Sequence, residues 1–172
     1  MKYPLQDVKQ RTGHGLVRIT YCNIWNPSHE DNLLRTDAPA IIEIGYEAQQ
    51  VIPQMFVRIT VSDRPEGRNI FSVGTVNTPL QWFRDLPKAG TVSCRVKALP
   101  LMPGPYFLSL SLKTDYGPTG TADSLYLAVP IDVISEWEFP EEVSQTPPGA
   151  AHPARVYVPH TWSQEKNEAV RP

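Results

Sequence analysis

A group of glutamates near the C-terminal end of the chain has the residue type that glycosidases use. Paired carboxylates cleave glycosidic bonds when the fold holds them a few ångströms apart. Here they lie in EWEFPEEVSQTPPGAAHP, which is acidic and then rich in proline: Glu136, Glu138, Glu141 and Glu142. Such an extended stretch holds no fixed geometry, so we expect no glycosidase centre there.

The histidines and serines give no catalytic pattern. No Gly-x-Ser-x-Gly elbow occurs, and no Gly-x-x-x-x-Gly-Lys-Ser/Thr phosphate loop occurs. The histidines lack metal-ligand spacing: they are His14, His29, His152 and His160. We therefore expect no enzyme activity, no metal site and no cofactor.

The cysteines and two aspartates favour structural roles. Cys22 and Cys94 form no Cys-x-x-Cys. A sandwich could link them, but we expect both to be reduced and buried, because the chain has no leader segment. Asp63 and Asp115 each end a strand, and turn chemistry explains them better than ligand or calcium contact.

The composition is that of one globular domain. The chain has 172 residues, of which 41% are hydrophobic and 20% charged, enough for a core. The 18 prolines suit short strands rather than long helices. A net charge of −2 gives no electrostatic case for nucleic acid or anionic membrane. Without a long apolar run or a signal peptide, a cytoplasmic location is the default expectation.

The stretch Val96 to Lys113, VKALPLMPGPYFLSLSLK, organises the chain. A strand ends near Lys97, and Pro103-Gly104-Pro105 makes a tight turn. Tyr106, Leu108, Leu110 and Leu112 then alternate with Phe107, Ser109, Ser111 and Lys113. A period of two is typical of a strand with one face in a core, and the proline-glycine corner indicates antiparallel pairing.

Further strands follow from the same alternation. We expect them at 16–21, 42–49, 55–62, 70–77, 92–97 and 125–133, with a last one at 155–158. In 125–133 we place the alternate apolar residues in the core: Leu125, Leu127, Val129, Ile131 and Val133. Gly74 marks a bulge or a close approach, and Pro130 suits an edge or a bulge. About eight short strands without a helix predict an all-β antiparallel sandwich.

The chain divides into a sandwich with extended ends. We assign 1–14 to a flexible lead-in, 15–134 to the sandwich, 135–153 to a proline-rich linker, and 154–172 to a C-terminal strand and tail. After such a linker, the strand at 155–158 can pack at home, pair with a second copy, or stay loose.

Several segments together resemble one family. GHGLVRIT, IIEIGYEA, FSVGTVNT and LPLMPGPYFLSLSL, in this order and spacing, are similar to the C-terminal carbohydrate-binding domain of O-antigen polysaccharide ABC transporter ATP-binding proteins, the Wzt type. RVYVPHTW resembles that family's short terminal strand. The resemblance covers residues 11–162.

The resemblance implies an immunoglobulin-like β-sandwich in the cytoplasm, or on the cytoplasmic face of the inner membrane through the transporter. It implies a module that recognises O-polysaccharide, often at its modified non-reducing end, during lipopolysaccharide biosynthesis and export. Its partners would be the ABC transporter ATPase and membrane subunits, and a second copy that exchanges its last strand. The ATPase part itself is absent from this chain.

Sugar binding needs flat aromatic rings and planar or hydroxyl polar groups. The solvent side of the predicted sheet offers both, and its cations suit an anionic sugar, phosphate or carboxylate. The candidates are Arg58, Thr60, Asn77, Trp82, Phe107, Ser109, Ser111 and Lys113.

The same residues also fit a plain solvated sheet face, because serine, threonine and lysine alternate outward on many strands. The alternative function is therefore a structural or protein-interaction immunoglobulin-like domain without a sugar ligand.

Overall fold

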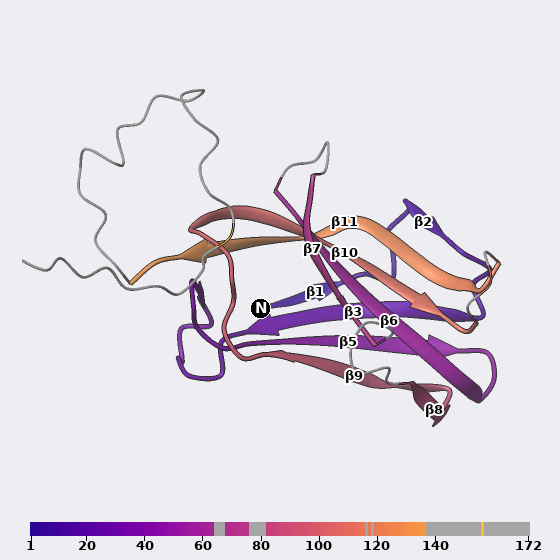
Figure 1. Ribbon diagram of the computed structural model, residues 1–172. Helices are drawn as coiled ribbons and strands as arrows, with labels where there is room; N and C mark the ends of the chain where they lie inside the picture. The colour runs from indigo at the N-terminus through magenta and orange to yellow at the C-terminus, as the bar shows by residue number, and fades with distance from the viewer. Residues whose placement is uncertain (64–67, 76–81, 116, 118, 137–155, 157–172) are drawn as a thin grey trace, which may run out of the picture.

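A computed structural model describes residues 1–63, 68–75, 82–115, 117, 119–136 and 156. These residues form eleven β-strands and no helix. The strands make two sheets that pack face to face (Figure 1). The predicted all-β, immunoglobulin-like antiparallel sandwich is confirmed.

The smaller sheet has four strands in the order β1-β3-β5-β9, all antiparallel. Its strands are β1 (Lys2–Pro4), β3 (Val17–Trp25), β5 (Ala40–Ala48) and β9 (Ala89–Val96). β9 is the last strand of this order, at one edge of the sheet.

The larger sheet has seven strands, with the main order β2-β11-β10-β6-β7. β4 pairs in parallel with the end of β11, and β8 pairs with the first half of β6. The strands are β2 (Arg11–Thr12), β4 (Leu34–Arg35), β6 (Ile52–Ser62), β7 (Asn69–Gly74), β8 (Phe83–Leu86), β10 (Gly104–Lys113) and β11 (Thr121–Ile134).

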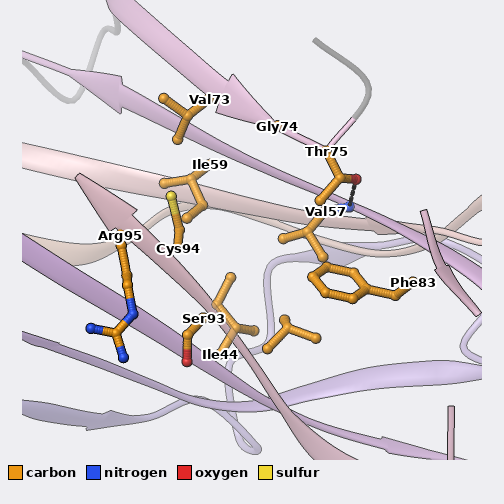
Figure 2. A pocket seen from close by; sticks show the side chains of 11 residues that line it. Ile44, Val57, Ile59, Val73, Gly74, Thr75, Phe83, Ser93, Cys94 and Arg95 are labelled. Carbon is orange, nitrogen blue, oxygen red and sulfur yellow. Dashed lines mark hydrogen bonds between the residues drawn. The ribbon is translucent and has the colours of Figure 1, made fainter. Parts of the chain in front are cut away.

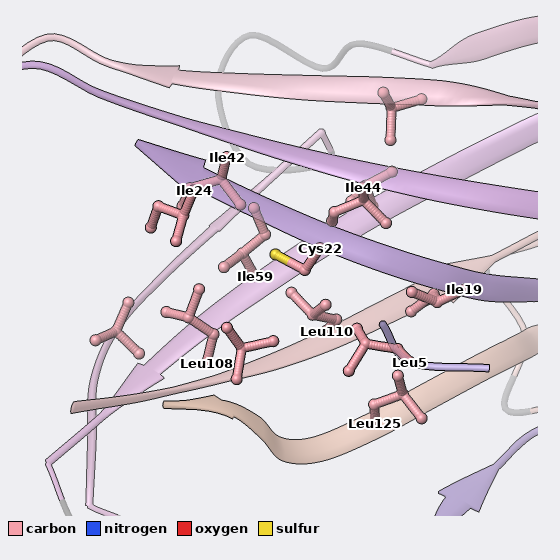
Figure 3. Close-up of a cluster of buried hydrophobic side chains, with 14 of the residues drawn as sticks. Leu5, Ile19, Cys22, Ile24, Ile42, Ile44, Ile59, Leu108, Leu110 and Leu125 are labelled. Atoms are coloured by element: carbon pink, nitrogen blue, oxygen red, sulfur yellow. The ribbon is translucent and has the colours of Figure 1, made fainter. Parts of the chain in front are cut away.

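The core lies between the sheets and follows the alternation of the sequence. Figure 3 shows side chains of both sheets meeting there, among them Ile44 of β5, Ile59 of β6 and Leu110 of β10. On β10 the fully buried residues are the predicted ones: Tyr106, Leu108, Leu110 and Leu112. Because one face of β10 is fixed in this way, the other face must point out of the sandwich.

Residues 1–14, which we expected to form a flexible lead-in, contact the sandwich in this structure. β1 pairs with β3, and Leu5 is only 2% exposed. Arg11 Nη1 lies 2.8 Å from Asp123 Oδ2 on β11, and the same carboxylate oxygen accepts a hydrogen bond from the Ile19 amide at 2.8 Å. The polar composition of the segment hid these long-range contacts.

The strand count and one core residue also differ from the predictions. Eleven strands form instead of about eight, because four of them have only two to four residues. Leu127 does not join the core: its φ is +48° and it lies in an irregular part of β11 between Leu125 and Val129.

The expectation of buried, reduced cysteines is confirmed for Cys22 and only in part for Cys94, and the turn at Asp115 is confirmed. Cys22 is buried and Cys94 is half-buried, and both are free thiols. Burial raises the pKa of Cys22 to about 12, so this thiol stays protonated. Asp115 closes a turn by accepting a hydrogen bond from the Gly117 amide at 2.7 Å.

The predicted linker and tail, 135–153 and 154–172, lie outside the described residues except for Ser135, Glu136 and Val156. β11 ends at Ile134. Val156 forms an isolated antiparallel bridge with the buried Leu101, which precedes β10.

Candidate functional site

The outward face of β6 and β10 collects most of the predicted site residues. The antiparallel register places Ser111 beside Arg58 and Ser109 beside Thr60. Further along β10 it places Phe107 beside Ser62 and Lys113 beside Phe56. We call the outward residues of β6 and β10 the polar face: Arg58, Thr60, Phe107, Ser109, Ser111 and Lys113.

The polar face continues onto the neighbouring strands in cross-strand rows. One row runs from Ser72 of β7 through Thr60 to Ser109. The next runs from Gly74 through Arg58 and Ser111 to Ser124 of β11. A Cβ on Gly74 would lie 3.0 Å from the Val57 carbonyl oxygen, so the expected close approach is present. Gly74 and Ser111, which lie on either side of Arg58 in this row, are both small residues.

The cations of the polar face have no partner in the described part of the chain. Arg58 is exposed and Lys113 is half-exposed. Neither forms an ion pair or a hydrogen bond among the described residues, whereas Arg11 and Arg35 both pair with carboxylates. Positive charges that are left unpaired beside hydroxyl groups are suited to an anionic or hydroxyl-rich ligand.

Two hydroxyls of the polar face are already engaged. The Thr60 and Ser72 hydroxyl oxygens lie 2.9 Å apart and share a hydrogen bond. Ser109 Oγ accepts a hydrogen bond from the Leu127 amide at 2.9 Å. Ser109 therefore supports the irregular part of β11 as well as lining the face.

Trp82 lies beside Phe56 of β6, at the end of the polar face where Phe56 is paired with Lys113. Its ring contacts Phe56, with 3.5 Å between ring centroids and 60° between ring planes. Phe56 is on the outward side of β6 yet is 3% exposed, which the sequence alone did not predict. Asn77, the remaining predicted site residue, lies outside the described residues.

Apart from the polar face, a pocket lies between the sheets at their β7 and β9 edges. Its volume is about 370 Å³, and Figure 2 shows that its wall is mostly apolar, with Ile59, Val73 and Phe83 among the lining side chains. Thr75 Oγ1 there accepts a hydrogen bond from the Val57 amide at 3.1 Å, and Arg95 points away from the apolar wall. This pocket therefore suits sugar hydroxyls less well than the polar face does.

The pocket and one exposed tyrosine escaped the sequence analysis. Cys94 lines the pocket, and burial raises the pKa of its thiol. Tyr126 of β11 is 56% exposed and directly follows Leu125, which pairs with Leu110. No sequence signal pointed to Tyr126, because Leu125, Leu127 and Val129 keep the apolar alternation intact.

Arg35, which lies away from the polar face, forms two ion pairs. Arg35 pairs with Asp31 and with Glu136, at 2.9 Å between Arg35 Nε and Glu136 Oε1. The hydrogen bond from Arg35 holds the pKa of Asp31 well below its usual range. Among the described residues no group of His, Cys, Asp or Glu is arranged to hold a metal ion. The same described residues contain no helix with the length and apolar character needed to cross a membrane.

A two-sheet antiparallel sandwich with a polar, cation-bearing outer face defines the class as an immunoglobulin-like β-sandwich module. A family model described as the Wzt C-terminal domain matches residues 8–145, and the chain belongs to this family. A crystal structure of the C-terminal domain of Wzt superposes with a TM-score of 0.67 at 11% identity, covering 90% of this chain and 87% of that one. No curated protein matches the sequence.

Proposed function

We propose that this chain is a non-catalytic module that binds O-antigen polysaccharide, at its modified non-reducing end, for export by an ABC transporter. Membership of the Wzt C-terminal domain family supports a role in O-antigen transport. The observation that carries the proposal is the polar face, where Arg58 and Lys113 have no partner among the described residues and lie beside the side-chain hydroxyls of Thr60, Ser109 and Ser111. In the cell the module would act on the cytoplasmic side, with the transporter's ATPase and membrane subunits.

The ligand contacts follow from the chemistry of the polar face. Arg58 and Lys113 would contact a negatively charged substituent or sugar hydroxyls, because charge-assisted hydrogen bonds are the stronger ones. Phe107 and Trp82 would cover the apolar face of a sugar ring. Ser111 and Thr60 would contact hydroxyls, and no bond is made or broken in this arrangement.

The test is a calorimetric titration with O-polysaccharide from the source organism, both intact and trimmed at its non-reducing end. We expect the intact glycan to bind more tightly. Arg58→Ala, Lys113→Ala and Trp82→Ala are each expected to weaken binding by about 1–3 kcal/mol where a charged or stacked contact is lost.

Arg95→Ala is the matched control, because Arg95 is an exposed arginine on the outer side of the four-stranded sheet. We expect this variant to bind as the parent does. If the intact polysaccharide does not bind the parent, the chain is the structural or protein-interaction domain instead. If the parent binds and all three alanine variants bind equally well, the site lies away from the polar face.

We also propose that the module forms a homodimer through its C-terminal strand. Val156 pairs with Leu101 and remains 44% exposed, which supports a strand-docking position beside Leu101. A linker of about 19 residues, from 135 to 153, reaches roughly 60 Å when extended, so the same position in a second copy is within range. Exchange between two copies closes on itself and stops at a dimer.

Light scattering tests the dimer. We expect a dimer for residues 1–172 and a monomer for a chain that ends at Ser135. A dimer that persists after this truncation would place the contact in the sandwich itself. A monomeric full-length chain would mean that Val156 pairs with Leu101 of its own chain.

A further inference from the structure

β11 contains an irregularity opposite the centre of the polar face. Leu108 pairs with Val129 and Leu110 pairs with Leu125. One residue of β10, Ser109, therefore faces three residues of β11, from Tyr126 to Ala128. Bulges of this kind bend a strand and change the direction of a side chain, and they occur often beside functional sites.

The bulge is built with a backbone conformation that leucine seldom adopts. The φ of Leu127 is +48°, in the left-handed region that is uncommon for residues other than glycine. Its amide donates to Ser109 Oγ at 2.9 Å. A side chain of the polar face thus holds the bulge in place, and such strain is retained when surrounding groups fix it.

The bulge presents Tyr126 to solvent. Tyr126 is 56% exposed, and its ring and hydroxyl have no partner among the described residues. Other tyrosines are engaged: Tyr21 donates to Glu43 Oε1 at 2.9 Å, and the buried Tyr106 donates to the Met102 carbonyl at 2.7 Å. An aromatic ring left open on a sheet face is available for stacking.

The position of Tyr126 extends the hydroxyl row. Ser72, Thr60 and Ser109 lie in register across β7, β6 and β10, and the bulge follows on β11. Three strand spacings of about 4.8 Å give a row roughly 14 Å long, which is longer than one pyranose ring. Hydroxyls along the row and an aromatic ring at its end are the two kinds of group that a sugar chain needs.

We propose that Tyr126 is a stacking residue for a pyranose ring of the bound glycan, and that Ser109 is the positioning residue that aims it. This inference rests on the proposed glycan-binding function of the polar face. The ring of Tyr126 covers the apolar C–H face of a sugar, and its hydroxyl is not required for that contact.

The experiment labels the protein with 3-fluorotyrosine and assigns the Tyr126 signal in ¹⁹F NMR with Tyr126→Phe. The probe is O-polysaccharide released from the source organism's lipopolysaccharide by mild acid, and the same samples give Kd by calorimetry. We expect the Tyr126 signal to shift on titration. Tyr126→Ala is expected to raise Kd about tenfold, and Tyr126→Phe to leave it within about twofold.

Ser109 is tested through the Tyr126 signal of the free protein. In Ser109→Ala the Leu127 amide loses its acceptor, so we expect that signal to move or broaden and Kd to rise. Ser109→Thr keeps an acceptor oxygen, so we expect its Tyr126 signal and its Kd to match those of the parent. A purely structural role for Ser109 would change stability without a change in the Tyr126 signal.

The outcomes separate this inference from the function on which it rests. If the parent binds and Arg58→Ala weakens binding while Tyr126→Ala does not, Tyr126 is not a stacking residue and the polar face stands. If Tyr126→Phe weakens binding as much as Tyr126→Ala, the hydroxyl rather than the ring makes the contact and stacking is wrong. If the parent does not bind the polysaccharide, both proposals fall together.

Discussion

The outer faces of the two sheets differ in whether their aromatic and charged side chains contact one another. On the four-stranded sheet, Lys2 Nζ lies 4.0 Å from the centre of the Tyr21 ring, and the Tyr21 hydroxyl donates to Glu43. That ring lies so close to Gly45 that a Cβ there would overlap it. On the outer side of the larger sheet, Arg58 and Lys113 of the polar face and Tyr126 of β11 lack such partners among the described residues.

This difference separates a cluster of groups that pair with one another, formed by Lys2, Tyr21 and Glu43, from groups that are open to a ligand. A cation over an aromatic ring and a hydroxyl on a carboxylate stabilise the four-stranded sheet internally. On the polar face Arg58 and Lys113 have no partner among the described residues, so their interaction energy is available for binding. Composition alone does not distinguish the two faces, because both carry aromatic and charged residues.

The largest effect is expected where the two sheets are joined. Asp123 of the larger sheet is 2% exposed, pairs with Arg11 and accepts a hydrogen bond from Ile19 of the smaller sheet. Asp123→Ala leaves the Arg11 guanidinium and that amide without this acceptor, so we expect the free energy of unfolding to fall by about 3–5 kcal/mol. Urea denaturation measures it.

Asp132→Ala is the control on the same strand, because Asp132 is exposed and is expected to cost under about 0.5 kcal/mol. Equal losses for both variants would contradict a special role for Asp123. Burial raises the pKa of Asp123 in the folded state despite Arg11. The stability that protonation contributes is therefore present below the unfolded pKa of about 3.9 and is lost as the pH rises through the folded value. Asp123→Asn removes this part of the pH dependence.

A methyl group at position 45 is expected to disrupt the contacts of Tyr21 on the outer face of the four-stranded sheet. In Gly45→Ala the Tyr21 ring must move and loses its bond to Glu43, so we expect a loss of about 1–3 kcal/mol in the free energy of unfolding. Glycan affinity is expected to be unchanged. Combining it with Tyr21→Ala removes the clash, and losses that simply add in the double variant would show that the ring is not the cause.

The smallest effect on stability is expected on the polar face. Arg58→Ala and Lys113→Ala remove side chains without described partners, so we expect unfolding free energies within about 0.5 kcal/mol of the parent. The thermal midpoint then stays nearly constant. A large loss of stability would mean that these cations support the fold, and the contrast between the two outer faces would disappear.

The sequence by itself determined which side of β10 is buried. Alternation assigned Leu108, Leu110 and Leu112 to the core and Ser109 and Ser111 to the outside, and the structure agrees. It also placed the turn at Asp115 and the free thiols. These features depend on neighbours in the chain, and a period of two is visible in a single sequence.

Only the tertiary structure decided which strands are neighbours and where their pairing is irregular. Nothing local says that Ser111 lies beside Arg58, that Arg11 reaches Asp123, or that Trp82 covers Phe56. The bulge at Leu127 likewise depends on a hydrogen bond that its amide donates to Ser109 Oγ on β10, eighteen residues earlier in the chain. Cross-strand register is set by contacts between distant segments, which alternation along one strand does not encode.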